Sequence, residues 1–139
     1  MSEPDDDLLA GVRVTTVAEI RQLPEKAQVV HVVDLDDEKF TALARCRELR
    51  DIIADGCERL TDSGLSTLER FEHLETLDIE GAERITGRCI DYLIFANKLK
   101  LLDIRGCSGL ERNDVWRLTS ALPNCEVEAD VQEDSEHGF

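Results

Sequence analysis

The chain has 139 residues, with 16 Lys and Arg against 31 Asp and Glu, and its formal net charge is −15. This balance argues against nucleic acid and anionic membrane surfaces as partners, because both are bound through a basic face. The hydrophobic content of 42% argues against a chain that is disordered throughout, and no apolar run reaches the roughly 18 residues of a membrane span. We therefore expect one folded domain without membrane insertion.

Both ends of the chain are polar and acidic. Residues 1–11 include the run Asp5–Asp7, and residues 132–139 include Glu133. We expect each end to be a disordered tail, and the folded domain to span residues 12–131. The first residues have neither a positive n-region nor a long apolar stretch, so a secretory signal is not predicted.

The folded domain is predicted to begin with a cap over residues 12–29. Val12 and Val14 alternate with polar residues, as in an edge strand. Thr16 followed by Glu19 fits a capping box, which opens a helix. The apolar residues of that helix are Val17, Ile20 and Leu23. Such a cap shields the first turn of a stack of repeats.

Three similar units follow the cap and begin at Leu49, Leu74 and Leu99. Each unit starts with alternating apolar and polar residues, which is typical of a strand with one buried face. A glycine follows where the chain must bend, and then an apolar pair three residues apart, the inward side of a short helix. The glycines are Gly56, Gly81 and Gly106, and the pairs are Leu65/Leu68, Ile90/Leu93 and Val115/Leu118.

A single unit cannot bury its own apolar edge, so we expect the units to stack. Stacking gives an α/β fold with a parallel sheet on one side and helices on the other. Two imperfect units flank the three clear ones. In the first, Val30 begins a strand that we align with the strand begun by Leu49, and Phe40 with Leu43 matches the helix pair. After the third unit, Val127 would start a last strand.

The pattern L-x-x-L-x-L-x-G-C-x-x-L-T-D-x-G-L-x-x-L in these units resembles the cysteine-containing leucine-rich repeat, which follows the F-box in ubiquitin-ligase substrate adaptors. Residues 49–68 match it almost throughout, whereas Ala82 replaces the cysteine in the next unit. The resemblance implies a leucine-rich-repeat solenoid, a short right-handed horseshoe with the sheet on its concave face and the helices on its convex face. A weaker resemblance, which includes residues 121–123, is to ATP synthase coupling factor B (subunit s).

The five cysteines are odd in number, and no two of them form a C-x-x-C motif. This pattern disfavours both a disulfide framework and a zinc site. We therefore expect reduced, mostly buried thiols in a cytoplasmic protein. Cys57 and Cys107 occupy the same repeat position, which favours packing over catalysis.

Residues that alternate with the strand leucines are predicted to point to the concave face in three columns. The predicted columns are Val32, Asp51, Thr76, Leu101, Glu126; Asp34, Ile53, Asp78, Asp103, Glu128; and Asp36, Asp55, Glu80, Arg105, Asp130. Parallel strands lie about 4.8 Å apart, so many carboxylates would crowd together. Such a face would be stabilised by contact with Lys or Arg side chains of a partner.

The function that we expect is therefore non-catalytic binding of a basic protein segment. The residues expected to contact it are Asp34, Asp36, Asp51, Ile53, Asp55, Thr76, Asp78, Glu80, Leu101, Asp103 and Arg105. Ile53 and Leu101 would either anchor apolar side chains of the partner or only fill space.

Two alternatives stay open. The contacts could lie on the loops or on the helical side, where Trp116 is either a cap over the last unit or an exposed contact. The chain could also be a substrate-recognition or assembly subunit of a larger complex, like a ubiquitin-ligase adaptor or a coupling factor. In the adaptor case residues 1–29 are too few for an F-box, which would lie on another chain.

Catalytic and cofactor-binding motifs are not found. The sequence has no G-x-S-x-G, Walker A or H-E-x-x-H pattern. It has no EF-hand loop, and calcium needs six to eight oxygens in a supporting loop. We therefore expect no enzymatic activity, no metal and no cofactor.

Overall fold

The computed structural model describes residues 11–130, so the two predicted tails, apart from Gly11, lie outside the described residues. Six parallel strands form one sheet in the order β1-β2-β3-β4-β5-β6. The strands are β1 (Val12–Val14), β2 (Val29–Val33), β3 (Asp51–Asp55), β4 (Thr76–Asp78), β5 (Leu101–Asp103) and β6 (Glu126–Glu128). The α/β class predicted from the sequence is confirmed.

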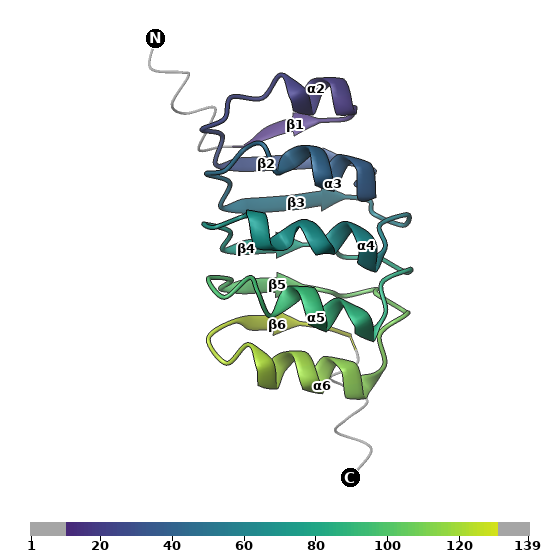
Figure 1. Cartoon of the computed structure of the whole chain (residues 1–139). Helices are drawn as coiled ribbons and strands as arrows, with labels where there is room; N and C mark the ends of the chain where they lie inside the picture. Colours follow the sequence, from purple (N-terminus) through teal and green to yellow (C-terminus); the bar gives the residue numbers. More distant parts are fainter. Residues whose placement is uncertain (1–10, 131–139) are drawn as a thin grey trace.

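The helices alternate with the strands along the chain. They are α2 (Val17–Arg21), α3 (Asp37–Leu43), α4 (Asp62–Leu65), the 3₁₀ helices η1 (Ser66–Arg70) and η2 (Gly87–Cys89), α5 (Ile90–Leu93) and α6 (Arg112–Ala121). Figure 1 shows the helices on one side of the sheet, each beside its own strand, so that the order in space follows the order in the chain. No helix within residues 11–130 has the length and apolar character needed to cross a bilayer.

The N-terminal cap has the structure that its sequence predicts. The Thr16 hydroxyl accepts a hydrogen bond from the Glu19 backbone N–H at 3.1 Å, and the Glu19 carboxylate accepts one from the Thr16 N–H at 3.1 Å. This reciprocal capping box satisfies backbone donors that the first helical turn leaves unpaired. Ile20 and Leu23 are buried in the core.

The core consists of the apolar positions that recur from unit to unit. Leu49, Leu74 and Leu99 are all buried, and so are both members of each predicted helix pair. Each unit thus completes its neighbour's core, as expected for a stack that no single unit could stabilise.

Each glycine after a strand has the left-handed backbone that the bend requires. The φ angles of Gly56, Gly81 and Gly106 are 92°, 86° and 74°. Asp34 occupies the equivalent place in the first unit, and its φ angle is 52°. The equivalence follows from the hydrogen bonds, because the Asp34 N–H donates to the Asp55 carbonyl and the Leu35 N–H donates to the Gly56 carbonyl. Residues other than glycine rarely adopt this conformation, and Asp is among those for which it costs least.

This position of Asp34 corrects the predicted register of the first unit. The structure pairs Val29 with Asp51, whereas the sequence predicted Val32 there, a shift of three residues. The cause is Ala27, which is fully buried and stands where Leu49 stands in the next unit. Its N–H donates to the Pro24 carbonyl as the Leu49 N–H donates to that of Cys46. A small residue at the leading leucine position hid the start of the unit.

The cysteines are all free, and four of the five are buried. The thiols of Cys57 and Cys107 donate to the carbonyls of Glu80 and Ile79, each at 3.3 Å. Burial raises the pKa of Cys57 to about 12 and that of Cys107 to about 11. These two thiols therefore pack in the core as predicted, in their protonated form.

Candidate protein-binding surface

One face of the sheet carries no helix, and we call it the outer sheet face (Figure 1). Its side chains alternate along each strand with the buried core residues, and in β2 and β3 they are half-buried. The first column across the strands is Val29, Asp51, Thr76, Leu101 and Glu126; the central column is Arg13, His31, Ile53, Asp78, Asp103 and Glu128; the third is Val33 and Asp55, continued beyond the strands by Glu80, Arg105 and Asp130.

Nine of the predicted contact residues lie on this face. They are Asp51, Ile53, Asp55, Thr76, Asp78, Glu80, Leu101, Asp103 and Arg105. Asp34 and Asp36 do not, because of the register shift in the first unit. Asp34 lies at the bend after β2, and Asp36 caps α3 by accepting a hydrogen bond from the Lys39 N–H at 2.9 Å. The outer residues of β2 are instead Val29, His31 and Val33.

Arg13 adds a positive charge at the β1 side of the face, which the sequence prediction missed. It belongs to β1, and its guanidinium lies 2.6 Å from a carboxylate oxygen of Asp55 on β3. This contact spans the width of β2 and pairs the charge of Asp55 within the chain. The signal in the sequence was the predicted edge strand, since a residue between Val12 and Val14, which both pack against the core, must point outward.

Asp103 is also neutralised within the chain. It is only 5% exposed, and the Arg105 guanidinium donates to its two oxygens at 3.0 and 2.7 Å. Burial acts to raise the pKa of Asp103, but the hydrogen bonds from Arg105 outweigh it and hold that pKa below its ordinary value. Asp103 and Arg105, which we expected to contact a partner, therefore already bind each other within the chain, and their contact with a partner stays a prediction.

Asp78 lies beside Asp103 on the neighbouring strand and has no ion pair within the described residues. Its carboxylate accepts only a hydrogen bond from the Glu80 N–H, at 3.1 Å. Burial raises the pKa of Asp78, and the negative charges of Asp103 and Glu80 raise it further. The surroundings of Asp78 therefore disfavour its ionised form.

A second such carboxylate belongs to β6. The pKa of Glu128 is raised by a hydrogen bond with the Glu126 side chain, by burial and by the charge of Asp103. We call the carboxylates of β4 to β6 and the residues just beyond them the acidic end of the face. The acidic end comprises Asp78, Glu80, Asp103, Glu126, Glu128 and Asp130, with Arg105 as its basic residue.

The oxygens of Asp78, Glu80 and Asp103 lie within 4.8 Å of one another, which is close enough to hold a cation. That place already has one, because the Arg105 guanidinium lies 2.7 Å from Asp103 and 3.6 Å from Glu80. A metal ion would have to displace the guanidinium, so we assign no metal to this cluster.

Large apolar side chains are exposed on the helical side. Ile94 is 43% exposed, Phe95 57% and Trp116 67%. The interpretation of Trp116 as a cap over the last unit is therefore wrong, since most of its surface meets solvent. Its position on the outer side of α6 leaves the alternative, an exposed contact residue.

Comparisons with known proteins do not assign a function to either side of the molecule. No family model matches the chain, and no curated protein matches its sequence. What the surface can bind therefore follows from its geometry and its charges.

Proposed function

We propose that this chain is a non-catalytic protein-binding module whose acidic end binds a basic protein segment. The observation that carries the proposal is the crowding of carboxylates around Arg105: oxygens of Asp78, Glu80 and Asp103 lie within 4.8 Å of one another, and their like charges repel. The raised pKa values of Asp78 and Glu128 agree with this repulsion. A Lys or Arg of a partner placed here would relieve that repulsion. Arg105 forms ion pairs with Asp103 and, at a longer distance, with Glu80. Its charge also acts on Asp78 and Glu128, but within residues 11–130 neither of these carboxylates has an ion pair.

We further propose that the architecture is a leucine-rich-repeat solenoid with the outer sheet face on its concave side. Support comes from the three similar units, the recurring buried leucines and the left-handed glycine after β3, β4 and β5. In such a solenoid the open sheet face is the continuous surface that a partner reaches.

The size of the electrostatic effect favours several weak contacts over one strong contact. Two unit charges about 5 Å apart interact by less than about 1 kcal/mol in bulk water, and salt screens them further. Several such contacts steer a basic segment toward the face and raise the association rate. We therefore expect binding that weakens steeply with salt.

Apolar side chains lie within the same face and add a second requirement on the partner. Leu101 is half-buried and sits between Thr76 and Glu126 in the first column, and Ile53 adjoins Asp78 in the central column. A segment with basic and apolar side chains in alternation fits this pattern, because the basic groups meet carboxylates while the apolar ones cover Leu101.

The test uses a short synthetic peptide in which Lys alternates with Leu, and its counterpart with Glu in place of Lys. We expect the Lys peptide alone to bind, and the double variant D78N/E128Q to bind it several-fold more weakly, as loss of contacts worth about 1 kcal/mol implies. The matched control is E38Q/D91N, which removes two exposed carboxylates on the helical side. Equal weakening in both variants would show that only net charge matters and would overturn the proposal.

A further inference from the structure

The helical side has a groove whose charged lining residues are three arginines and two glutamates, Glu69 and Glu72. Two hollows, of about 490 and 460 Å³, share Thr41 and Arg70 as lining residues and so lie side by side, and we call the two together the groove. It runs from the end of α3 past η1 to the last residues of α5. Arg45, Arg47 and Arg70 line the first hollow, with Glu72 the acidic residue there. In this first hollow arginine outnumbers glutamate, although the net charge of the chain is −15.

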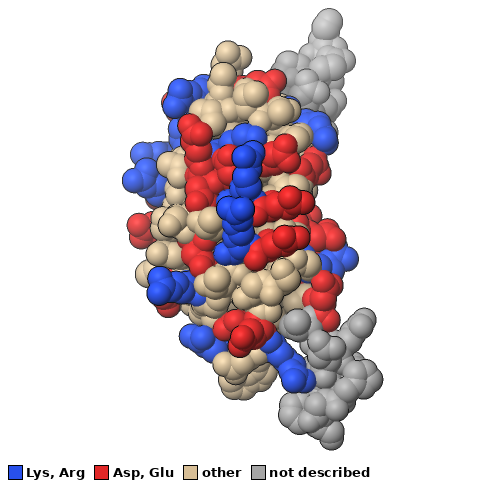
Figure 2. Space-filling model, turned by 90° about the vertical axis from the view of Figure 1, so that its right-hand side faces the viewer, with Lys and Arg blue, Asp and Glu red and all other residues tan. Residues whose placement is uncertain are grey.

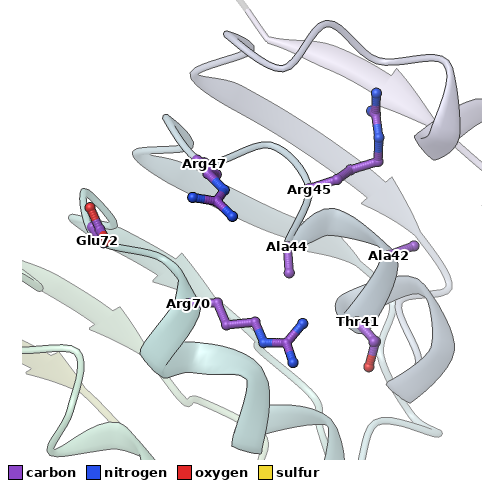
Figure 3. A pocket seen from close by; sticks show the side chains of 7 residues that line it. All are labelled: Thr41, Ala42, Ala44, Arg45, Arg47, Arg70 and Glu72. Carbon is purple, nitrogen blue, oxygen red and sulfur yellow. The ribbon is translucent and has the colours of Figure 1, made fainter.

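The arginines of the groove are not equivalent. The guanidinium of Arg45 donates to the carbonyls of Ile20 and Leu23, at 3.2 and 2.6 Å, and so holds the cap against α3. Figure 3 shows Arg45 directed away from the hollow, while the guanidinium groups of Arg47 and Arg70 extend into it and Glu72 lies at its edge. Within residues 11–130, Arg47 and Arg70 have no ion pair or hydrogen bond from their side chains.

Other exposed arginines do not form such a groove. Arg59 and Arg84 lie in loops that follow β3 and β4, and neither lines one of the two hollows. Figure 2 looks onto the edge where the strands end and shows basic side chains in a column between rows of acidic ones.

The other end of the groove is aromatic. Tyr92 and Phe95 line the second hollow together with Thr67, Ser66 and Glu69. Phe95 is 57% exposed and the adjacent Ile94 is 43% exposed, so this end offers apolar surface to a partner. Arginine and aromatic side chains are the types most enriched among residues that dominate binding energies.

We propose that this groove binds an acidic segment of a partner protein, with carboxylates on Arg47 and Arg70 and an apolar side chain on Phe95. Carboxylates pair well with the planar guanidinium, which can donate two parallel hydrogen bonds to them. A small anion would use the arginines but leave Phe95 uncovered, whereas a peptide segment uses both ends. This surface is separate from the acidic end of the sheet face, and either can exist without the other.

The test measures binding of a labelled synthetic peptide in which Asp and Glu flank one Phe, using fluorescence anisotropy and the full chain. We expect the variant R47Q/R70Q to lose about tenfold or more in affinity, as loss of two charge-assisted contacts implies. The control R59Q/R84Q has the same net charge and is expected to bind as the parent does. Equal losses in both variants would overturn the proposal. Circular dichroism checks that each variant is folded.

A second comparison tests the aromatic end. F95A is expected to weaken binding of the Phe peptide, but not of a peptide with Ala in place of Phe. Displacement of the Phe peptide by inorganic phosphate at similar concentrations would reassign the groove to small anions. Concentration-dependent self-association that R47Q/R70Q abolishes would reassign it to a second copy of the chain. Either result would overturn the proposed occupant.

Discussion

Thr86 donates both its backbone N–H and its hydroxyl to the carboxylate of Asp62, at 3.0 and 2.6 Å. Thr61 and Asp37 repeat this arrangement one unit earlier, at 2.8 and 2.6 Å. In both pairs the carboxylate near the start of one helix holds the N-cap residue of the next helix. The pairs therefore fasten successive units together at their helix starts. The next unit has Gly87 at the position of Asp62, which ends the series.

We predict that D37A destabilises the fold by about 1–3 kcal/mol, because it leaves the half-buried N–H and hydroxyl of Thr61 without an acceptor. Urea denaturation measures the free energy of unfolding. The control is E38A, which removes an exposed carboxylate one residue away and is expected to change stability by less than about 0.5 kcal/mol. If the two variants are equally stable, the pairing of units through Asp37 contributes nothing measurable.

The bends after the strands give a prediction about backbone conformation. A methyl group on Gly81 would meet no atom within 4 Å, yet φ there is +86°. We therefore expect G81A to lose about 1–2 kcal/mol through backbone strain alone. The reciprocal change D34G, at the equivalent bend with φ 52°, is expected to be close to neutral, since relief of strain offsets the added freedom of the unfolded chain. Thermal unfolding of both variants measures these changes in stability. A G81A variant as stable as the parent would refute the role of backbone strain.

The repeat made most of the fold predictable from the sequence. The leucine spacing identified the strands β3, β4 and β5, the buried helix pairs and the bends, because each unit repeats the same contacts. The first unit failed at Ala27, where a buried small residue replaces the leucine that marks the start of a unit. That position is recognised only through hydrogen bonds to Pro24 and the register of β2, neither of which leaves a local signal in the sequence.

The candidate sites were less predictable than the fold. Register placed nine contact residues on the sheet face, but it could not show that two of the carboxylates are paired. The contact of Arg105 with Asp103, two residues away, depends on side-chain rotamers, and that of Arg13 with Asp55 reaches across β2. The groove on the helical side was missed altogether. Arg47 and Arg70 are far apart in the sequence, and only the stacking of α3 on η1 brings them to the same hollow.

The cysteines give a prediction about chemical reactivity. Cys46, Cys57, Cys89 and Cys107 are buried, and burial raises the pKa of Cys57 and Cys89 to about 12. Cys125 is half-buried and the most accessible of the five. Since the thiolate is the reactive form, a thiol reagent at mildly alkaline pH is expected to label Cys125 first and the others only on unfolding. Peptide mass spectrometry identifies the labelled residues, and early labelling of Cys57 would contradict the packing described.

Asp78 links stability to pH in a way that distinguishes it from Asp103. Its raised pKa means that the folded state binds a proton more tightly than the unfolded chain does, so acidification favours folding at this residue. This stabilisation is fully present below the ordinary pKa of Asp and is lost as the pH rises through the raised pKa. At neutral pH the ionised Asp78 is therefore a net cost to the fold. For Asp103, whose pKa is lowered, the sign is reversed: its contribution is present at neutral pH and is lost on acidification.

We therefore predict that D78N stabilises the protein at neutral pH, by less than about 1 kcal/mol, and that this gain disappears as the pH falls below the ordinary pKa of Asp. R105Q should have the opposite effect at neutral pH, because it leaves the buried Asp103 without its cation. Urea denaturation at several pH values measures both effects. A D78N variant that is more stable and also binds the Lys peptide more weakly would show that the fold gives up stability at this carboxylate for binding. A variant that is less stable at neutral pH would mean that the contact with the Glu80 N–H outweighs the repulsion, and would remove the main support for the acidic end as a binding site.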